Sequence, residues 1–527
     1  MKHLSSLPLK SQWTAFHKDF SSSLHYESVA GKETFLFDLP MDTRQLMFLH
    51  GKCPDPRIGD LSTQSDWVAT REWWFINHFE GAALEEGQKA FIRIRGMDQL
   101  AEIFVNGIHL GSSESFNQVH YFDATTAWKS GTNELSIRLW TCDPTDIQST
   151  DEAAKNQLGG DAANMNMGMA GLFKATTQSL KSRMLYGGDQ NPFMLSCGLA
   201  IAPEVIIARY VLPEFIRSEY EYHADNYHVS GLFLIQAQAW GASDYELTIR
   251  PKNFEWESFT LRGKWTEPTS FLTIPFSHLP LKPWTVFDLG FPHCYELILK
   301  TGGQTLTVTT GFRKYERRLN TAFKSSPPAS AFDWNGYENQ SYGQDYYKGY
   351  ETVEEGGDKA WPEVPREYGT YHFDHYLNGQ KYFAKGGSVV PTNLFWSDWD
   401  GEHLRRVVRR ARESNNNTLR VWGGGYLSGD EFFEEADLQG VSISQDFLNF
   451  SGGTDKSLFH QKRLENEFRN VISQLNIHPS VVVLNGGNEL YQFGTINRPT
   501  DPIFQMMERV MRQMGQNQYF HRSSPIN

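Results

Sequence analysis

A polar pair, Asn488-Glu489, follows a segment with the composition of a turn and a buried strand. The apolar run 481–484 predicts the strand, and a short stretch, 485–487, separates it from the pair. At the C-terminal end of a barrel strand, Glu489 would point into the pocket, where a carboxylic acid with a raised pKa can protonate a leaving group. Asn488 could hydrogen-bond a sugar hydroxyl next to the reacting carbon. Alternatively, Glu489 could only favour the N-terminus of a following helix.

A second group of candidate residues lies at 420–426, where an arginine and a tryptophan precede three glycines. Trp422 at a strand end could form a stacking wall for a pyranose ring, and the glycines would let the backbone approach closely. Arg420 could steer or hold a catalytic carboxylate, or it could form a plain ion pair inside a barrel. A phosphate-binding loop is a weak rival, because the spacing matches neither G-x-G-x-x-G nor a Walker motif.

Asp446, in Gln445-Asp446-Phe447, is the third candidate and ends another predicted strand. Its carboxylate could bond a substrate or orient a neighbouring side chain. A structural ion pair is an equal alternative for this residue.

A parallel sheet would bring these candidates together, and the pattern after residue 366 predicts one. Strands alternate with helices there, and Gly440 is a typical residue after a helix C-terminus. Repeated strand–helix units imply a parallel sheet with functional groups where the strands end. The predicted strands are 382–390, 418–422, 441–446, 481–484 and the start of a fifth at 519–523, and the predicted helices include 404–411, 430–438, 464–475 and 503–514.

The earlier residues have the pattern of antiparallel β-structure. Residues 1–212 favour a β-sandwich, and their clearest hairpin turns at Asn106-Gly107, a pair that tolerates positive φ in a type I′ turn. Short, evenly spaced strands over 213–318 indicate an immunoglobulin-like sandwich. Residues 319–365 combine a Ser-Pro run, a Tyr/Gly-rich run and an acidic region, which indicates a linker or surface loop. The predicted fold class is therefore multidomain, β followed by α/β.

Composition excludes several classes of partner. The chain has 527 residues and a net charge of −13, which argues against nucleic acid, whose affinity comes from neutralised phosphates. No apolar run reaches the roughly 18 residues of a membrane helix, and residues 1–20 lack a signal-peptide pattern. The cysteines are too widely spaced for a zinc site or a disulfide framework: Cys53, Cys142, Cys197 and Cys294. We expect a cytoplasmic protein with no metal, cofactor, membrane or nucleic-acid partner.

Together these motifs resemble glycoside hydrolase family 2, in its β-mannosidase-like branch, which also contains exo-β-glucosaminidases. The resemblance covers nearly the whole chain. It implies a galactose-binding-like jelly roll over 1–212, an immunoglobulin-like sandwich over 213–318 and an incomplete TIM (β/α)₈ barrel over 366–527. The residues that carry it are 71–75 and 101–111 in the jelly roll, 311–313 at the end of the second domain, 377–379 and 385–386 at the start of the barrel, and 420–426 and 478–489 within it.

The resemblance also implies a retaining, exo-acting β-glycosidase. Glu489 matches the family's acid/base, Asn488 the amide beside it, and Trp422 a residue of the sugar-binding wall. Asp189 matches an aspartate that the first domain contributes to the substrate pocket. In the two-carboxylate mechanism, the acid protonates the glycosidic oxygen while a second carboxylate, roughly 5–5.5 Å away, attacks the anomeric carbon. Water activated by the same Glu489 then opens the covalent intermediate.

The sequence departs from the family pattern around these positions. Gly188 and Gln190 stand where tryptophans usually flank the aspartate. Leu484 replaces a usual Trp, Gly487 a usual Asn, and Ser388-Val389 a frequent Asn-Trp. These changes put a mannose-fitted pocket in doubt, so the resemblance does not fix the sugar.

The family's nucleophile, a glutamate near the end of a later strand, has no counterpart in the sequence. After Glu489 the only carboxylates are Asp501, in a predicted loop, and Glu508, in a predicted helix. Residues 366–527 are also fewer than the about 250 of a complete barrel. Three hypotheses follow: an N-terminal part of a longer β-mannosidase-like glycosidase, one half of a split glycosidase whose barrel a second polypeptide completes, or a non-catalytic carbohydrate-binding protein. In each, the partner is a carbohydrate, a β-mannoside or a related β-glycoside.

Overall fold

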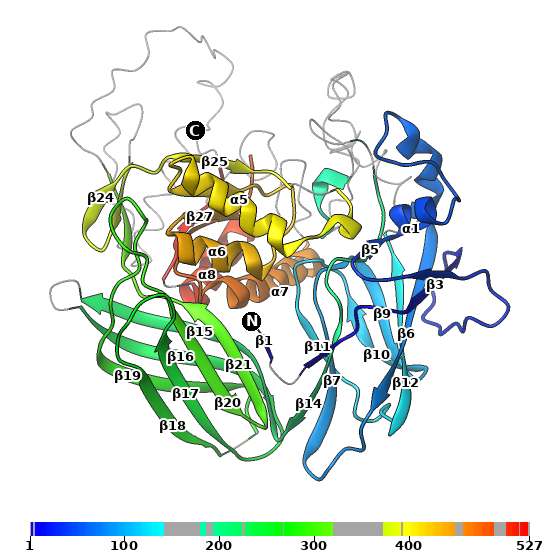
Figure 1. Cartoon of the computed structure of the whole chain (residues 1–527), viewed down its shortest axis with the longest axis horizontal. Helices are drawn as coiled ribbons and strands as arrows, with labels where there is room; N and C mark the ends of the chain where they lie inside the picture. The colour runs from blue at the N-terminus through cyan, green and yellow to red at the C-terminus, as the bar shows by residue number, and fades with distance from the viewer. Residues whose placement is uncertain are drawn as a thin grey trace, which may run out of the picture.

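The chain forms two β-sandwiches and an α/β unit. In Figure 1 the second sandwich (green) lies beneath the α/β unit (yellow to red), and the first sandwich (blue to cyan) lies to the right of both. The computed structural model describes residues 2–3, 6–141, 180–185, 192, 194–223, 227–266, 268–319, 373–391, 394–447, 457–489, 502–515 and 517–524. Asp189 and all but the first residue of the predicted linker 319–365 therefore lie outside the described residues.

The first sandwich packs two antiparallel sheets against each other. Its elements are β2 (Ser6–Pro8), β3 (Trp13–Asp19), β4 (Phe35–Phe37), β5 (Met41–Asp42), α1 (Thr43–Leu49), η1 (Leu61–Thr70), β6 (Arg71–Gly81), β7 (Gln88–Ile94), β8 (Met97–Asp98), β9 (Leu100–Val105), β10 (Ile108–Ser113), β11 (His120–Asp123), β12 (Gly131–Trp140), η3 (Arg183–Leu185), β13 (Gly198–Leu199) and β14 (Glu204–Arg209). The sheet orders are β10-β9-β12-β6-β3-β4 and β11-β7-β14-β2, with a short third sheet β5-β13-β8.

Strand β6 shows why the larger sheet is buried on both faces. Trp73 and Phe75 belong to the core between the sheets, whereas Trp74 and Ile76 pack in a separate cluster with Phe16. Because successive side chains of a strand point to opposite faces, a strand covered on both sides needs a continuous apolar run.

The predicted hairpin at Asn106-Gly107 is confirmed. Both residues have positive φ, 51° and 79°, as a type I′ turn requires. The turn joins β9 to β10, and Ile108 pairs with Val105 directly across it.

The second sandwich is also antiparallel and has its own core. Its strands are β15 (Val211–His223), β16 (His228–Ala239), β17 (Ser243–Pro251), β18 (Phe259–Trp265), β19 (Phe271–Pro280), β20 (Tyr295–Thr301) and β21 (Gln304–Thr310), arranged as β15-β16-β19 and β21-β20-β17-β18. The N-terminal strand β1 (Lys2–His3) adds to the edge at β21. Alternate residues of β16, including Phe233 and Ile235, are fully buried in the core.

A small antiparallel sheet, β22 (Tyr315–Leu319), β23 (Phe373–Leu377) and β24 (Gln380–Tyr382), leads into the α/β unit. It corrects one prediction, because 382–390 is not a single strand. Tyr382 ends β24 and packs in a buried cluster with Leu377 and Tyr519, whereas β25 (Gly386–Val389) begins the parallel sheet. The prediction failed because the apolar residues Phe383 and Ala384 follow Tyr382 without forming part of a strand, and Phe383 is 80% exposed.

The α/β unit alternates strands and helices as predicted. Its further elements are η4 (Trp396–Asp398), α5 (Gly401–Glu413), β26 (Thr418–Val421), α6 (Asp430–Gln439), β27 (Ser442–Asp446), α7 (Leu458–Leu475), β28 (Val481–Asn485), α8 (Pro502–Met514) and β29 (Tyr519–His521). The strands form one parallel sheet in the order β25-β26-β27-β28-β29. Local signals mark the helix ends: the Asp400 side chain accepts from two amides at the start of α5, and Gly440 follows α6 in the left-handed region.

The two faces of this parallel sheet differ in chemistry. Val421 and Ile443 belong to the core that the sheet shares with the helices. Their neighbours Arg420 and Ser444, which pair with each other in register, therefore point to the opposite face. A parallel sheet that is covered by helices on one face and carries Arg420 and Ser444 on the other is consistent with part of a (β/α)₈ barrel, and the predicted fold class is confirmed.

Both sandwiches are hydrogen-bonded to the α/β unit. From the second sandwich, the buried Arg313 guanidinium donates to the carbonyls of Pro479, Val481 and Asn517 at 2.6–2.7 Å. From the first, Asn117 accepts from the amide of Leu427 at 2.9 Å. These bonds fix the starts of β28 and β29 and the loop after β26. Within the described ranges, no helix is long and apolar enough to cross a membrane.

Candidate active site

An ion pair between Arg420 and Asp446 lies where β26 and β27 end. Asp446 Oδ2 accepts from Arg420 Nη2 at 2.5 Å, and Oδ1 accepts from Nε at 3.2 Å. The carboxylate is 1% exposed. Burial raises its pKa, against the opposing effects of Arg420, Asn485 and the amide of Gly423. Arg420 is therefore the countercharge that lets this carboxylate stay buried.

Asn488 and Glu489 lie just beyond β28, on the same edge of the sheet. Asn488 is buried, and its Oδ1 accepts from Arg420 Nη2 at 2.7 Å. The backbone bonds to the segment after β29, with Glu489 N donating to Ser524 O at 2.8 Å and Ser524 N to Gly487 O at 3.0 Å. Glu489 has a φ of 53°, which is uncommon for a residue with a Cβ, and its side chain is partly exposed. The structure thus brings Arg420, Asp446 and Asn488 together and places Glu489 beside them.

Gly423 allows the loop after β26 to approach this cluster. Its amide donates to Asp446 Oδ2 at 3.1 Å. A Cβ at this position would lie 2.7 Å from Phe447 O and 3.2 Å from Asn488 N. The close backbone approach predicted from the glycines therefore exists, and it requires glycine here.

Trp422 opens the same loop, and its ring lies over Gly424. A Cβ at position 424 would come within 2.0 Å of the indole. The ring also packs against a cluster that contains Trp396 of η4 and Met184 of the first sandwich. Gly424 O accepts from Ser182 Oγ and from Met184 N, both at 3.0 Å. Hydrogen bonds from the first sandwich therefore hold the loop that carries Trp422 in place.

Asp189 lies outside the described residues, so its predicted place in the pocket stays a prediction. The described residues on either side of its segment are close together, because Met194 N donates to Leu185 O at 2.9 Å.

Two further polar residues join the cluster that sequence reasoning did not identify. Asn485 Nδ2 donates to Asp446 Oδ1 at 2.7 Å, and Asn485 Oδ1 lies 3.0 Å from Nδ1 of His521. Asp446, Asn485 and His521 are in register on three neighbouring strands. The signal that could have identified Asn485 and His521 is their position at predicted strand ends.

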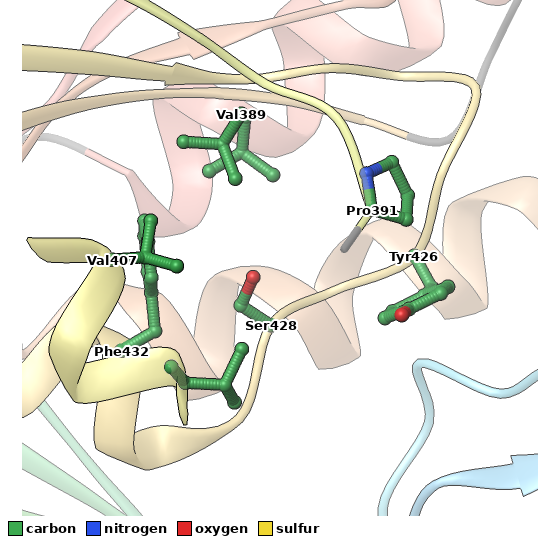
Figure 2. Close-up of a pocket in the computed structure, with 8 residues that line it drawn as sticks. Val389, Pro391, Val407, Tyr426, Ser428 and Phe432 are labelled. Carbon is green, nitrogen blue, oxygen red and sulfur yellow. The ribbon is translucent and has the colours of Figure 1, made fainter. Parts of the chain in front are cut away.

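A cavity near these strands is too small for a sugar. It lies among β25, the loop after β26 and helices α5 and α6 (Figure 2), and its lining includes Val389, Pro391, Tyr426 and Phe432. Its volume is about 20 Å³, room for about one water. We interpret it as a packing gap behind the Trp422 loop.

Known proteins are similar to this chain in sequence and in fold. Residues 25–200 match the glycosyl hydrolase 2 galactose-binding-like domain. A probable β-mannosidase of Caenorhabditis elegans is 21% identical over 488 residues, covering 89% of this chain and 48% of that protein. The β-mannosidase of Mus musculus is 29% identical over 446 residues, covering 84% of this chain and 46% of that protein. The chain thus spans about half the length of the curated relatives it matches.

Solved structures share the fold across nearly the whole chain. A β-D-mannosidase from Dictyoglomus thermophilum superposes with a TM-score of 0.74 at 20% identity, covering 99% of this chain and 58% of that chain. The exo-chitosanase CsxA of Amycolatopsis orientalis gives 0.65 at 13% identity, covering 98% and 53%. At these identities the likeness shows the fold alone. The matched domain, the β-mannosidase relatives and the shared fold together confirm the resemblance to glycoside hydrolase family 2 and its β-mannosidase-like branch.

Proposed function

We propose that this chain is the acid/base-bearing part of a retaining, exo-acting β-glycosidase of the β-mannosidase type. The observation that carries the proposal is the position of Glu489. It follows directly on the buried Asn488, which Arg420 holds, at the edge of the sheet where the parallel strands end. Functional groups of (β/α)₈ barrels gather at that edge.

The contacts of Asn488 define what its side chain can offer a substrate. Its Oδ1 accepts from Arg420, so the amide nitrogen is directed away from the guanidinium. That NH₂ group would donate to a hydroxyl oxygen of the bound sugar, next to the bond that breaks. Glu489 would protonate the glycosidic oxygen in the first step and activate water in the second.

Asp446, the other carboxylate of the described cluster, has both oxygens bonded to protein donors and is therefore not a candidate for the second carboxylate of this mechanism. We propose that the second carboxylate comes from the half of the relatives' length that this chain does not span, either in the same polypeptide or in a second one. Trp422 would form one wall of the sugar site, and Asp189 would be contributed by the first sandwich. The β-mannosidase relatives support a terminal β-mannoside or a related β-glycoside as substrate.

The role of Glu489 can be tested in the full-length gene product with Glu489→Ala. Loss of a general acid should slow hydrolysis of a β-mannoside with a poor leaving group by about 10²–10⁴-fold. With a 2,4-dinitrophenyl β-mannoside, the rate of the first step should fall much less, because this leaving group needs no proton. Azide should then raise turnover and yield the β-glycosyl azide, since an anionic nucleophile needs no general base.

If Glu489→Ala slowed hydrolysis of both substrates equally, and azide did not raise turnover, the acid/base role would be refuted. Residues 1–527 alone should hydrolyse p-nitrophenyl β-mannoside no faster than their Glu489→Gln variant, with the exposed Glu413→Gln as control. Fast turnover by that chain, abolished in Glu489→Gln, would place a second catalytic carboxylate within it. Sugar binding by the full-length product without any turnover would instead favour the non-catalytic carbohydrate-binding hypothesis.

A further inference from the structure

His521 is the third polar residue in a row that crosses the ends of β27, β28 and β29. Asp446 pairs in register with Asn485, and Asn485 with His521, so the three side chains share one face of the sheet. Two residues earlier on that face, Tyr519 is buried in the cluster with Tyr382. His521 is therefore one step nearer the C-terminal edge of the sheet, at the level of Asp446, and is partly exposed.

The hydrogen bonds of Asn485 determine its orientation. One end of its amide lies 2.7 Å from Asp446 Oδ1, which already accepts from Arg420. A carboxylate bound to a guanidinium only accepts, so the amide end facing it is the donor, Nδ2. Oδ1 consequently faces His521, and it can only accept.

This orientation fixes the tautomer of His521. Nδ1, 3.0 Å from Asn485 Oδ1, must carry a proton, and the neutral ring then has a lone pair on Nε2. Within the described part of the chain, Nε2 has no hydrogen-bond partner. Burial, and then the positive charges of Arg317, Arg420 and Arg522, lower the pKa of His521 well below its usual value, so the ring is neutral.

We propose that His521 is a substrate-binding residue whose Nε2 accepts a hydrogen bond from a hydroxyl of the bound sugar. This inference rests on the proposed function, since it assigns a further contact within the same site. It complements Asn488, whose amide NH₂ is directed away from Arg420 and would donate to the sugar. A sugar hydroxyl can donate to Nε2 of His521 and accept from the amide of Asn488, so both side chains can bind hydroxyls of the same sugar.

The tautomer can be tested without any turnover. In the chain labelled with ¹⁵N-histidine, the signals absent from His521→Phe belong to this ring. We expect a protonated Nδ1 and an unprotonated Nε2, unchanged down to about pH 5.5, where an ordinary histidine with a pKa of about 6.5 is mostly charged. A protonated Nε2, or a ring charged at that pH, would overturn the inference.

Sugar binding is then followed in the same sample with methyl β-D-mannoside, and affinity is measured by calorimetry. We expect the Nε2 signal to shift on binding, and His521→Phe to weaken affinity about 3- to 10-fold, as for loss of one neutral hydrogen bond. His521→Gln, which keeps an acceptor, should recover part of the affinity. The control His375→Phe should leave it unchanged, because His375 lies in β23 and bonds to Tyr315.

The outcomes separate this inference from the proposed function. If the sugar binds without moving the Nε2 signal, or binds equally well to His521→Phe, His521 is not a sugar ligand, and the role of Glu489 is untouched. If no sugar binds to the chain at all, the proposed sugar site and this inference both fail.

Discussion

Both carboxylate oxygens of Asp446 are occupied by protein donors. Arg420 bonds to each of them, Asn485 bonds to Oδ1, and the amide of Gly423 bonds to Oδ2. Of the roles predicted for Asp446, this geometry favours orienting a neighbour over bonding a substrate. Arg420 in turn bonds to Asn488, so side chains from successive strands position the residue next to Glu489.

The dependence of Asp446 on Arg420 leads to a stability prediction. Arg420→Met should lower the free energy of unfolding by about 2–4 kcal/mol, somewhat less than for a fully buried pair because the Arg420 side chain is 25% exposed. Without the guanidinium, the folded pKa of Asp446 rises further above its unfolded value. Stability from such a group is present below the unfolded pKa and is lost as pH rises through the folded pKa. The penalty, measured by urea unfolding, should therefore be larger at about pH 8 than at about pH 5.

The matched control is Arg406→Met on α5, because Arg406 pairs with Asp400 at 3.5 Å with both side chains about half exposed. This variant should change the free energy of unfolding by no more than about 0.5 kcal/mol. Adding Asp446→Asn to Arg420→Met should recover part of the loss. A penalty that is equal at both pH values and is not relieved by Asp446→Asn would show that Arg420 stabilises by packing alone.

At the scale of elements, helix α7 docks on the first sandwich through a buried carboxyl. Glu467 Oε1 accepts from Asn117 Nδ2 at 2.9 Å, and burial raises the pKa of Glu467 to about 7. Because this folded pKa lies above the usual value of 4.5, the stabilisation is full below about pH 4.5 and is lost as pH rises through about 7. The free energy of unfolding should therefore fall between about pH 5 and pH 7, by at most about 1.4 kcal/mol per pH unit.

Glu467→Gln should remove this slope, because the amide keeps an acceptor for Asn117 and carries no charge. The control Glu465→Gln lies on the same helix, where Arg469 and Arg509 pair with the carboxylate and its pKa is lowered. That variant should retain the slope of the unmodified chain. An unmodified chain whose stability is flat between about pH 5 and pH 7 would contradict the assignment.

The sequence predicted those elements whose signals are local. The turn at Asn106-Gly107, the amphipathic helix α7 and the helix end at Gly440 each depend on a few adjacent residues. The strand prediction at 382–390 failed because Tyr382 and Gly386 pair with different strands, and no local pattern records that choice. Asn485 and His521 escaped prediction for a similar reason, because only the register of three strands brings their side chains together.

At the scale of the whole molecule, a buried ion pair of the first sandwich reaches the candidate site. Lys181 Nζ lies 2.6 Å from Asp98 Oδ2, and both side chains are at most 1% exposed. Trp396, beyond β25 in the α/β unit, donates its indole N–H to the same oxygen at 2.8 Å. The residue after Lys181, Ser182, donates to Gly424 in the Trp422 loop. One charge pair thus anchors two loops of the α/β unit to the first sandwich.

Lys181→Met should therefore destabilise the protein and loosen these loops together. Removing one partner of a buried pair costs about 3–5 kcal/mol, because the other charge remains buried without compensation. The control Lys89→Met breaks an exposed pair with Asp123 on the same sandwich and should change stability by less than about 0.5 kcal/mol. Urea unfolding gives the stability, and proteolysis within 422–428 reports the loop. A destabilised Lys181→Met protein whose loop is cleaved no faster than in Lys89→Met would show that the pair stabilises only the sandwich, and that Trp422 is positioned by the α/β unit alone.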